Sequence, residues 1–370
     1  MRKGGLPIII LMLLLAASLA VYLIWQMKSP TPEESLITVT GALGRTVNIT
    51  LPINRVIIAG KGSWPIVSAA YMFPSAKNLL YGLSEGTDVP LLKMVDPDIE
   101  SKIVPTMGGT PNVEEMAAEN PDVVILKTTL KSDVGDPLEE LGFKVIYVDL
   151  EDLNSYMRDI MVLGKIFGDE AKAETMVKYY NETYNFVLER TSTLTERPKV
   201  LLLCYSTKGG KVSFQAPGAG WLQTFMIEAG GGYPLSKELI GTGWNTISYE
   251  QIAQWNPDII FLVTYSDEPS ANDVKDMLLQ DPDWGSINAV MNEKVYAVPH
   301  DCNNIGALGS WDATGSRWIL GLEWMAKKIH PYIFSDINIA EKAKSFYIEM
   351  YGLRDGNAAA VVDGIKGDLQ

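Results

Sequence analysis

Two segments of this chain repeat each other without a gap. Residues 114–126 read EEMAAENPDVVIL and residues 250–262 read EQIAQWNPDIIFL, at a constant offset of 136 residues. In each copy a short helix opens at a Glu, ends before Asn-Pro because proline disfavours a helical conformation in the preceding residue, and leads into a buried strand. The same helix–turn–strand unit therefore occurs twice, which predicts two similar lobes. Asn-Pro-Asp is also ordinary turn chemistry, so the repeat does not by itself indicate a function.

Apolar, β-branched runs alternate with helical segments around both copies of the repeat. This rhythm is typical of an α/β fold in which a parallel sheet is covered by helices. It restarts after Arg197, so we expect one α/β lobe over residues 36–151 and a second over residues 196–352. The expected strands are 55–60, 123–126 and 145–148 in the first lobe, and 199–205, 258–263 and 294–298 in the second.

A proline-free helical stretch, residues 152–195, separates the two lobes. We expect one helix over 152–167 and another from 170 to about 194, with a break at Gly168-Asp169. The second part carries an apolar stripe at helical spacing: Met176, Val177, Tyr180, Tyr184, Val187 and Leu188. About 25 helical residues span roughly 37 Å, enough to run along two small lobes and limit hinge motion. A helix packed inside one domain remains the alternative, because periodicity does not locate a helix in space.

Residues 1–35 contain an uncharged apolar segment. Residues 6–25 read LPIIILMLLLAASLAVYLIW, and about 20 apolar residues are what a helix needs to cross a bilayer. Two basic residues precede the segment, which places the rest of the chain outside the cytoplasm. Its length favours a retained membrane anchor over a cleaved signal peptide, although small residues within it suit cleavage. The polar, proline-containing segment 28–35 is predicted to be a tether.

The composition excludes some classes of protein. The 370 residues carry 31 Lys and Arg against 45 Asp and Glu, a net charge of −14, without the basic patch that nucleic-acid binding needs. The two His (His300, His330) and two Cys (Cys204, Cys302) show no metal-ligand spacing. The two cysteines form a disulfide outside the cytoplasm or stay buried thiols. Residues 353–370 are rich in Gly, Asp and Ala and are predicted to be a loosely held tail.

Five segments, in order along the chain, carry a resemblance to a known family. They are residues 37–60 (ITVTGALGRTVNITLPINRVIIAG), 108–126 (GGTPNVEEMAAENPDVVIL), 247–262 (ISYEQIAQWNPDIIFL), 294–299 (KVYAVP) and 316–331 (SRWILGLEWMAKKIHP). Over about residues 37–351 the chain resembles the solute-binding proteins of ABC importers for iron siderophores and cobalamin. The resemblance implies two Rossmann-like lobes joined by a single long α-helix. It also implies a ligand captured between the lobes and partners in an ABC permease with its ATPase subunit, with neither a cofactor nor catalysis.

The resemblance gives two acidic residues a specific role. Members of this family carry one exposed Glu on each lobe that docks into Arg pockets of the permease, and the matching positions are Glu114 and Glu250. The two are also equivalent in the internal repeat. A Glu in the first turn of a helix is favoured by the helix dipole, which is the alternative explanation. Because capping tolerates Asp or Ser as well, two Glu at one repeat position favour docking; Glu115 is the nearest competitor.

The candidate ligand-binding residues lie in loops after the predicted strands. In an open parallel sheet, ligands bind beyond the carboxyl ends of the strands. Aromatic walls with a few fixed polar groups suit a bulky chelate. The candidates are Lys61, Ser63, Trp64, Thr110, Lys127, Tyr205, Trp221, Trp244, Tyr265, His300 and Trp311. Each has an ordinary alternative: a solvated charge for a loop lysine, core packing for a tryptophan, and no ligand role for a lone histidine.

Three functions stay open at this point. The first is an anchored receptor for a metal chelate: a ferric siderophore, haem or corrinoid. The second is a solute-binding protein of the same type of importer whose ligand is an oxyanion such as molybdate or tungstate. Binding an oxyanion needs converging N–H and hydroxyl donors instead of an aromatic trough. The third is an extracytoplasmic chelatase, for which two histidines in late loops offer no acid–base constellation. Residues 60–63 lack the spacing of a phosphate-binding loop, so ATP binding is excluded.

Overall fold

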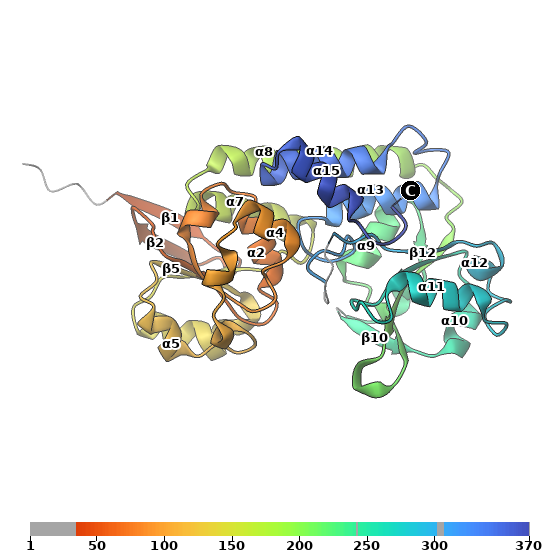
Figure 1. Ribbon diagram of the computed structural model, residues 1–370, viewed down its shortest axis with the longest axis horizontal. Coiled ribbons are helices and arrows are strands. Elements are labelled where there is room, and N and C mark those ends of the chain that lie inside the picture. Colours follow the sequence, from red (N-terminus) through yellow and green to blue (C-terminus); the bar gives the residue numbers. More distant parts are fainter. Residues whose placement is uncertain (1–34, 242, 302–306, 370) are drawn as a thin grey trace, which may run out of the picture.

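Two α/β lobes lie side by side below a layer of longer helices in the computed structural model (Figure 1). It describes residues 35–369 except residues 242 and 302–306. The predicted membrane segment, nearly all of the tether, and Cys302 lie outside these described residues. Within the described part of the chain, no helix has the length and apolar character needed to cross a bilayer.

The first lobe is built on a sheet of four parallel strands. Its strands are β3 (Val56–Ile58), β4 (Leu80–Leu83), β5 (Val123–Lys127) and β6 (Val145–Val148), in the order β4-β3-β5-β6. The β5 and β6 side chains are all buried, which is why both segments read as continuous apolar runs. The helices of this lobe are α2 (Trp64–Ala70), α3 (Ala76–Leu79), α4 (Pro90–Val95), α5 (Val113–Ala118) and α6 (Asp136–Glu140). A separate antiparallel hairpin, β1 (Leu36–Thr40) with β2 (Thr46–Thr50), precedes them.

The second lobe has a mixed sheet: the three strands predicted from the sequence are parallel as expected, and an antiparallel extension joins them. Its strands are β7 (Lys199–Ser206), β8 (Ser213–Pro217), β9 (Tyr233–Pro234), β10 (Trp244–Ile247), β11 (Ile259–Val263) and β12 (Val295–Ala297). The order is β10-β8-β7-β11-β12, and β8 is antiparallel to both β7 and β10. Gly209 and Gly210, both at φ 73°, let the chain reverse tightly between β7 and β8 instead of crossing over through a helix. The covering helices are α9 (Leu222–Ala229), α10 (Tyr249–Trp255), α11 (Ala271–Gln280) and α12 (Asn288–Met291).

The two copies of the repeat fold alike. In the first copy α5 leads into β5, and in the second α10 leads into β11. Helix α10 ends directly before Asn256, and α5 ends two residues before Asn120. Both Asn120 (φ 48°) and Asn256 (φ 47°) adopt the left-handed conformation. Asn tolerates this conformation better than most residues, and the following proline prevents the helix from continuing. The turn chemistry read from the sequence is therefore present in both lobes.

The Asp of each Asn-Pro-Asp ties its strand to a neighbouring strand. Asp122 Oδ2 accepts hydrogen bonds from the backbone N–H groups of Asn54 (2.7 Å) and Arg55 (3.0 Å), immediately before β3. Asp258 Oδ2 accepts one from the N–H of Lys199 (2.9 Å), at the start of β7. The repeated Asp therefore has a structural role at the amino ends of both sheets, on the side opposite the predicted ligand loops.

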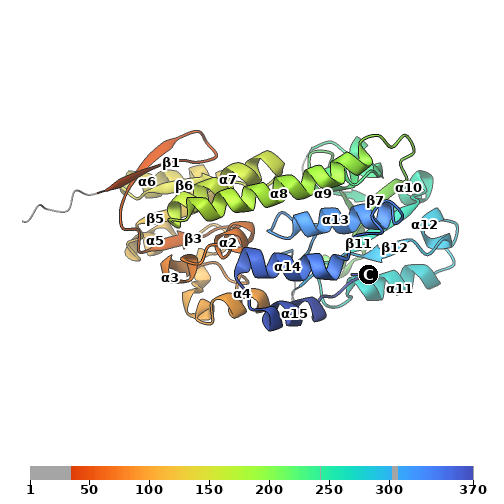
Figure 2. The same cartoon turned by 90° about the horizontal axis from the view of Figure 1, so that it is seen from above.

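Two helices follow the first lobe. They are α7 (Leu153–Ile166) and α8 (Glu170–Thr191), with Gly168 at φ 68° between them. At about 1.5 Å per residue, the 22 residues of α8 extend roughly 33 Å. Helix α8 packs against α7 on the side of the first lobe and, on the side of the second, against α9 and α13 (Trp318–Ile329), as Figure 2 shows from above.

The chain ends in two packed helices, so the predicted loose tail is wrong. Helix α14 (Ile339–Tyr351) is followed by α15 (Asp355–Asp363), which packs against it through residues such as Ala358. Beyond α15, the Asp368 carboxylate accepts hydrogen bonds from the Ala297 backbone N–H (2.7 Å) and from Lys275 Nζ (2.7 Å). The Gly, Asp and Ala composition thus reflects a tightly turned segment that covers the edge of β12.

A buried polar cluster connects the lobes. Arg317 forms a two-pronged ion pair with Asp301, through Nε–Oδ2 (2.8 Å) and Nη2–Oδ1 (3.2 Å), and both side chains are fully buried. Arg317 Nη1 also donates to Oγ of Ser68 on α2 (2.7 Å), and the Tyr351 hydroxyl donates to the Ser68 carbonyl (3.0 Å). The middle of α2 is therefore fixed to the second lobe, at the start of α13 and the end of α14.

Candidate functional site

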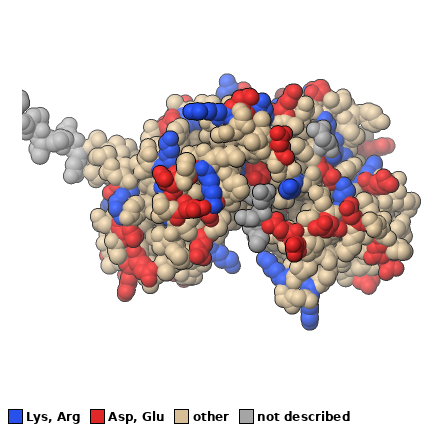
Figure 3. Space-filling model, viewed as in Figure 1, with Lys and Arg blue, Asp and Glu red and all other residues tan. Residues whose placement is uncertain are grey.

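A cavity of about 390 Å³ lies between the two lobes. Its walls come from the carboxyl ends of strands in both sheets, because two parallel sheets facing each other present these ends to a common crevice. Figure 3 shows the surface indented between the lobes at the lower edge of that view. The lining residues are Gly62, Trp64, Pro65, Lys127 and Glu151 from the first lobe, and Lys208, Trp221, Gln223, Trp244, Tyr265, Ala307, Ala313 and Thr314 from beyond it.

Three aromatic side chains form one wall of this cleft. The rings of Trp221 and Trp244 meet edge to face, with centroids 5.2 Å apart at 87°, and those of Trp244 and Tyr265 lie 5.9 Å apart at 63°. Two glycine-containing loops bring the tryptophans together: a Cβ on Gly218 would lie 2.2 Å from the Gly241 carbonyl oxygen. Only a residue without a side chain allows this approach. The wall is preformed, with apolar faces available to a flat or bulky ligand.

Tyr265 is held in a strained backbone conformation. Its φ of 49° is unusual for a bulky residue and indicates that its surroundings fix it. Its hydroxyl donates to Oδ2 of the buried Asp312 (2.5 Å), whose Oδ1 accepts from the Ser310 hydroxyl (2.5 Å). Burial raises the pKa of Asp312, against the effect of these hydrogen bonds, and raises the pKa of Tyr265 far above its usual range. Tyr265 is therefore a neutral hydrogen-bond donor within the aromatic wall.

Gln223 adds a polar group to the base of the cleft. Its Nε2 donates to Asp312 Oδ2 over 3.4 Å, which orients the amide. Its Oε1 is buried and has no hydrogen-bond partner among the described residues. A buried acceptor without a partner costs free energy, on the order of 1–3 kcal/mol. This oxygen is therefore a natural acceptor for a hydrogen-bond donor of a bound ligand.

The charged groups of the cleft are divided between its walls. Lys127, at the end of β5, is buried, and its Nζ donates to the Asp149 carbonyl oxygen and to the Glu151 carboxylate. Glu151 itself remains half exposed, with 49 % of its side chain accessible. Lys208 lies on the opposite wall, in the exposed turn between β7 and β8. The lining thus combines two cations with one carboxylate, although the whole chain is acidic.

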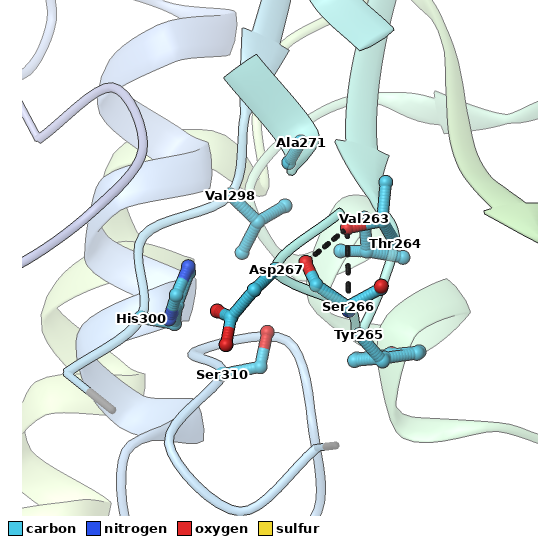
Figure 4. Close-up of a pocket in the computed structure, with 9 residues that line it drawn as sticks. All are labelled: Val263, Thr264, Tyr265, Ser266, Asp267, Ala271, Val298, His300 and Ser310. Carbon is cyan, nitrogen blue, oxygen red and sulfur yellow. Dashed lines mark hydrogen bonds between the residues drawn. The ribbon is translucent and has the colours of Figure 1, made fainter. Parts of the chain in front are cut away.

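A smaller cavity lies behind Tyr265. It measures about 20 Å³, the size of one water molecule. Figure 4 shows the Asp267 carboxylate between the imidazole of His300 and the hydroxyl of Ser310. Tyr265 borders both cavities, so the two are neighbours. His300 accordingly lies beside the main cleft and does not line it.

Of the eleven predicted ligand residues, the structure brings five into the cleft. They are Trp64, Lys127, Trp221, Trp244 and Tyr265. Lys61 and Thr110 are exposed outside the lining, and Ser63 is buried with its hydroxyl donating to Ser84 (3.1 Å). Tyr205 and Trp311 are buried in the core, Trp311 without any exposed surface. The side chains of Ser63, Tyr205 and Trp311 point into the protein, so they do not line the cleft.

The sequence reading missed four polar lining residues: Glu151, Lys208, Gln223 and Thr314. Glu151 and Lys208 follow β6 and β7, so the rule that ligands bind at the carboxyl ends of strands covers both. Gln223 lies within α9, where no sequence signal separates it from a packing residue. Of the two cysteines, Cys204 is a buried thiol whose pKa burial raises to about 12.

Glu114 and Glu250 occupy matching positions on the two lobes. Each is the second residue of its helix, α5 or α10, and each is exposed. Other side chains already cap these helices: Asn112 Oδ1 accepts from the Glu114 backbone N–H (2.9 Å), and Ser248 Oγ caps α10. A hydrogen bond from the Ser248 hydroxyl lowers the pKa of Glu250. Both glutamates thus present their carboxylates to solvent, next to helices that have their own cap.

The chain belongs to the periplasmic binding protein family, whose model matches residues 86–302. It is 21 % identical to the molybdate-binding protein MolA of Haemophilus influenzae over 85 % of this chain and 90 % of that protein. The solved structure of MolA also aligns with this chain, with a TM-score of 0.68 at 19 % identity, over 86 % of this chain and 98 % of that one. MolA is described there as the cognate periplasmic binding protein of an ABC transporter. The haem uptake protein IsdE of Staphylococcus aureus is 25 % identical over 53 % of this chain and 66 % of that protein. A periplasmic solute-binding protein from Veillonella parvula superimposes with a TM-score of 0.72 at 25 % identity, over 89 % of this chain and 99 % of that one.

These comparisons confirm the resemblance read from the sequence. The chain is a periplasmic binding protein and works outside the cytoplasm, as its family does. Its relatives are named for different ligands, molybdate and haem among them. The nature of the ligand must therefore be argued from the cleft.

Proposed function

We propose that this protein captures a metal chelate, namely a ferric siderophore, haem or corrinoid, between its lobes. It then delivers the chelate to a permease and its ATPase subunit while the N-terminal segment holds it at the membrane. The observation that carries the proposal is the aromatic wall of Trp221, Trp244 and Tyr265, which shares one cavity with Trp64 of the other lobe. Helix α8, running along both lobes, would restrict their relative motion, so the cleft is expected to change little on binding.

The volume of the cleft supports a ligand larger than an inorganic anion. Four oxygens at the roughly 30 Å³ that a water occupies would fill about 120 Å³. The cavity measures about 390 Å³ and opens to solvent at the indentation between the lobes. A small oxyanion would leave most of the aromatic surface wet, whereas a chelate with an organic rim would cover it.

The second candidate ligand is an oxyanion such as molybdate or tungstate. Two observations favour it: the likeness to MolA, which extends over most of both chains, and the two cleft lysines, Lys127 and Lys208. However, Lys127 is already engaged by Glu151, and a compact oxyanion is bound best by several converging donors. The chelate therefore remains the better supported ligand.

The test is direct identification of what the protein binds. The full chain is purified from its host and analysed by native mass spectrometry, and the apoprotein is titrated with haemin, cyanocobalamin, ferric desferrioxamine and sodium molybdate while tryptophan fluorescence is followed. Saturable quenching by one of the three chelates is expected, because three tryptophans line the cleft. Saturation by molybdate alone would establish the second candidate. Metal insertion into a free porphyrin by the protein would instead reveal a chelatase.

We also propose that Glu114 and Glu250 dock the two lobes onto the permease. Their exposure and their equivalent positions at the starts of α5 and α10 support this role. Glu114→Arg and Glu250→Arg should each reduce uptake in cells at least tenfold while affinity for the chelate stays unchanged. Glu115→Arg is the matched control, one residue along the same helix. Normal uptake by both variants would show that docking uses other residues.

A further inference from the structure

A second large cavity lies at the junction of the two lobes. It measures about 480 Å³ and is lined by residues from three parts of the chain. The first lobe contributes Tyr71, Met72, Pro74, Lys77, Met94 and Val95, the start of α8 contributes Lys172, and the α14–α15 turn contributes Met350, Tyr351, Gly352, Leu353, Arg354 and Asn357. Figure 2 shows α4 beside α14 and α15 at this junction. We call this cavity the junction pocket.

The junction pocket is separate from the ligand cleft. The two cavities share no lining residue among those described. They lie at opposite ends of α2: Trp64, its first residue, lines the cleft, and Tyr71, which follows its last residue, lines the junction pocket. Seven helical residues separate the two ends by about 10 Å. Between the two ends of α2, Ser68 is hydrogen-bonded to Arg317 and Tyr351, so α2 connects the two cavities.

Three cations from three different elements line the junction pocket. Lys77 lies on α3, Lys172 lies on α8, and Arg354 is the residue immediately before α15. None of the thirteen described lining residues is Asp or Glu, although the chain carries a net charge of −14. Within the described residues, neither Lys77 nor Arg354 forms an ion pair. Like charges gathered in this way raise the local positive potential and favour an anion.

Burial disfavours the charge of Lys172. Its Nζ donates to the backbone carbonyl of Glu349, and burial lowers its pKa, with Asp169 and Glu349 acting in the opposite direction. A lowered pKa means that the charged ammonium is less stable here than in water. An anion in the pocket would offset this penalty, which is a reason for it to bind.

Apart from Asn357 and the hydroxyls of Tyr71 and Tyr351, the remaining described lining is apolar. Met72, Met350 and Leu353 are buried, and Met94 is partly exposed, with 41 % of its surface accessible. Methionine side chains adapt to irregular apolar groups better than branched side chains do. A free inorganic anion would touch the cations and leave this surface uncovered. An anion with a short hydrocarbon chain would use both parts of the pocket.

We propose that the junction pocket binds a phosphomonoester attached to a short apolar chain. Phosphate suits three cations better than a carboxylate does, because it carries up to two charges and three acceptor oxygens, and Arg binds it through two parallel hydrogen bonds. Such a group occurs on a lipid head or on a free alkyl phosphate, and the pocket offers the same chemistry to both. This proposal does not depend on which ligand occupies the cleft.

Native methionines report on the proposal. The full chain is labelled with [methyl-13C]methionine, and hexyl phosphate is added while methyl NMR signals, assigned by single Met→Leu variants, are followed. The signals of Met72, Met94 and Met350 should shift together and saturate, whereas that of Met226, which lines neither cavity, should stay in place. Inorganic phosphate and hexanol should each bind at least tenfold more weakly. Dihexanoyl phosphatidic acid binding more tightly than hexyl phosphate would identify a lipid as the source; the reverse would identify a soluble phosphate ester.

Charge-neutral variants test the role of the cations. Lys172→Gln and Arg354→Gln should each weaken hexyl phosphate binding five- to tenfold. Lys178→Gln is the matched control: Lys178 lies on the same helix as Lys172, 73 % of its side chain is exposed, and it does not line the pocket. Circular-dichroism melting shows whether each variant is folded, and Arg354, being exposed, can be changed without disturbing the core. Equal affinity in all three variants, or no saturable shift of the three methionine signals, would overturn the proposal.

Discussion

The two lobes share a frame, namely the repeated helix–turn–strand unit and the parallel strands around it, but differ in the strands added to this frame. In both, a short capped helix is followed by a left-handed Asn and leads into an inner parallel strand. An Asp before that strand accepts hydrogen bonds from the start of the neighbouring strand. The first lobe stops at four parallel strands, whereas the second adds β8 and β10 through a hairpin. Trp244 lies on β10 and Trp221 follows β8, so the aromatic wall stands on this addition.

This difference separates two tasks. The repeated frame places Glu114 and Glu250 at equivalent points, as a symmetric docking surface needs. The antiparallel extension supplies two of the four aromatic side chains of the cleft, Trp221 and Trp244, whereas Tyr265 follows β11. The first lobe contributes Trp64 and the Lys127–Glu151 pair. We infer that the frame serves the permease and the addition serves the ligand. The predictions below test this asymmetry.

The largest effect is expected where the lobes are joined. Asp301→Ala leaves the fully buried Arg317 without its ion-pair partner, which should lower the free energy of unfolding by about 3–5 kcal/mol. Ser68→Ala removes a first-lobe hydroxyl that hydrogen-bonds Arg317, Ser316 and Tyr351, and should cost about 1–3 kcal/mol. Urea unfolding measures both. Equal costs would show that the Ser68 hydroxyl contributes as much to the junction as the Asp301–Arg317 ion pair.

The next effect concerns the aromatic wall. Trp244 contacts both Trp221 and Tyr265, so Trp244→Ala should weaken the chelate that the wild-type protein binds by about 30-fold, or ~2 kcal/mol. Trp64→Ala on the opposite wall should cost about tenfold or less. Isothermal titration calorimetry gives both values, with Trp255→Ala, outside the cleft lining, as the control. A larger loss at Trp64 would place the main ligand contact on the first lobe.

The shared frame predicts equal effects at the repeat. Asp122→Ala and Asp258→Ala each remove a carboxylate that accepts backbone N–H groups, at a cost of about 2 kcal/mol in stability. Neither residue lines the cleft, so chelate affinity should not change. Thermal unfolding and calorimetry on the two variants measure these effects side by side. A difference above about 1 kcal/mol would show that the two copies of the repeat are not energetically equivalent.

The smallest effect is expected at the Lys127–Glu151 pair. Glu151→Gln releases Lys127 for an anionic group of the ligand and should raise affinity two- to fivefold, modestly because Glu151 is half exposed. Lys127→Met should lower the affinity instead. The same titration measures both, and Glu140→Gln on α6 serves as a control outside the cleft. Weaker binding by Glu151→Gln would mean that Glu151 contacts the ligand itself.

Much of the frame follows from local sequence, but the wall does not. The central strands β5, β6, β7 and β11 form continuous apolar runs, and their positions were predicted to within about two residues. Strands β8 and β10 are short, and Gly and polar residues surround them, so they carry no such signal. Their pairing depends on contacts between segments far apart in the chain, which periodicity cannot show.

The candidate site divides in the same way. Trp311 and Trp221 both follow glycine-containing loops and look alike in the sequence. In the fold, Gly321 of α13 lets that helix pack directly against the Trp311 backbone, because a Cβ there would lie 2.0 Å from the Trp311 carbonyl oxygen. The glycines near Trp221 instead let two loops meet at the cleft. Which role a glycine has depends on what lies opposite it in space.

By itself, the sequence determined the class of this protein: the repeat, its turn residues and the order of apolar runs specify two related lobes, because these signals act over a few neighbouring residues. Only the tertiary structure decided the chemistry of the cleft. It paired β8 with β10, turned Trp311 inward and Trp244 outward, placed Glu151 against Lys127, and folded the C-terminal segment onto β12 and the junction pocket. Each of these outcomes rests on contacts between residues distant in the chain, whose energies exist only once the lobes have packed.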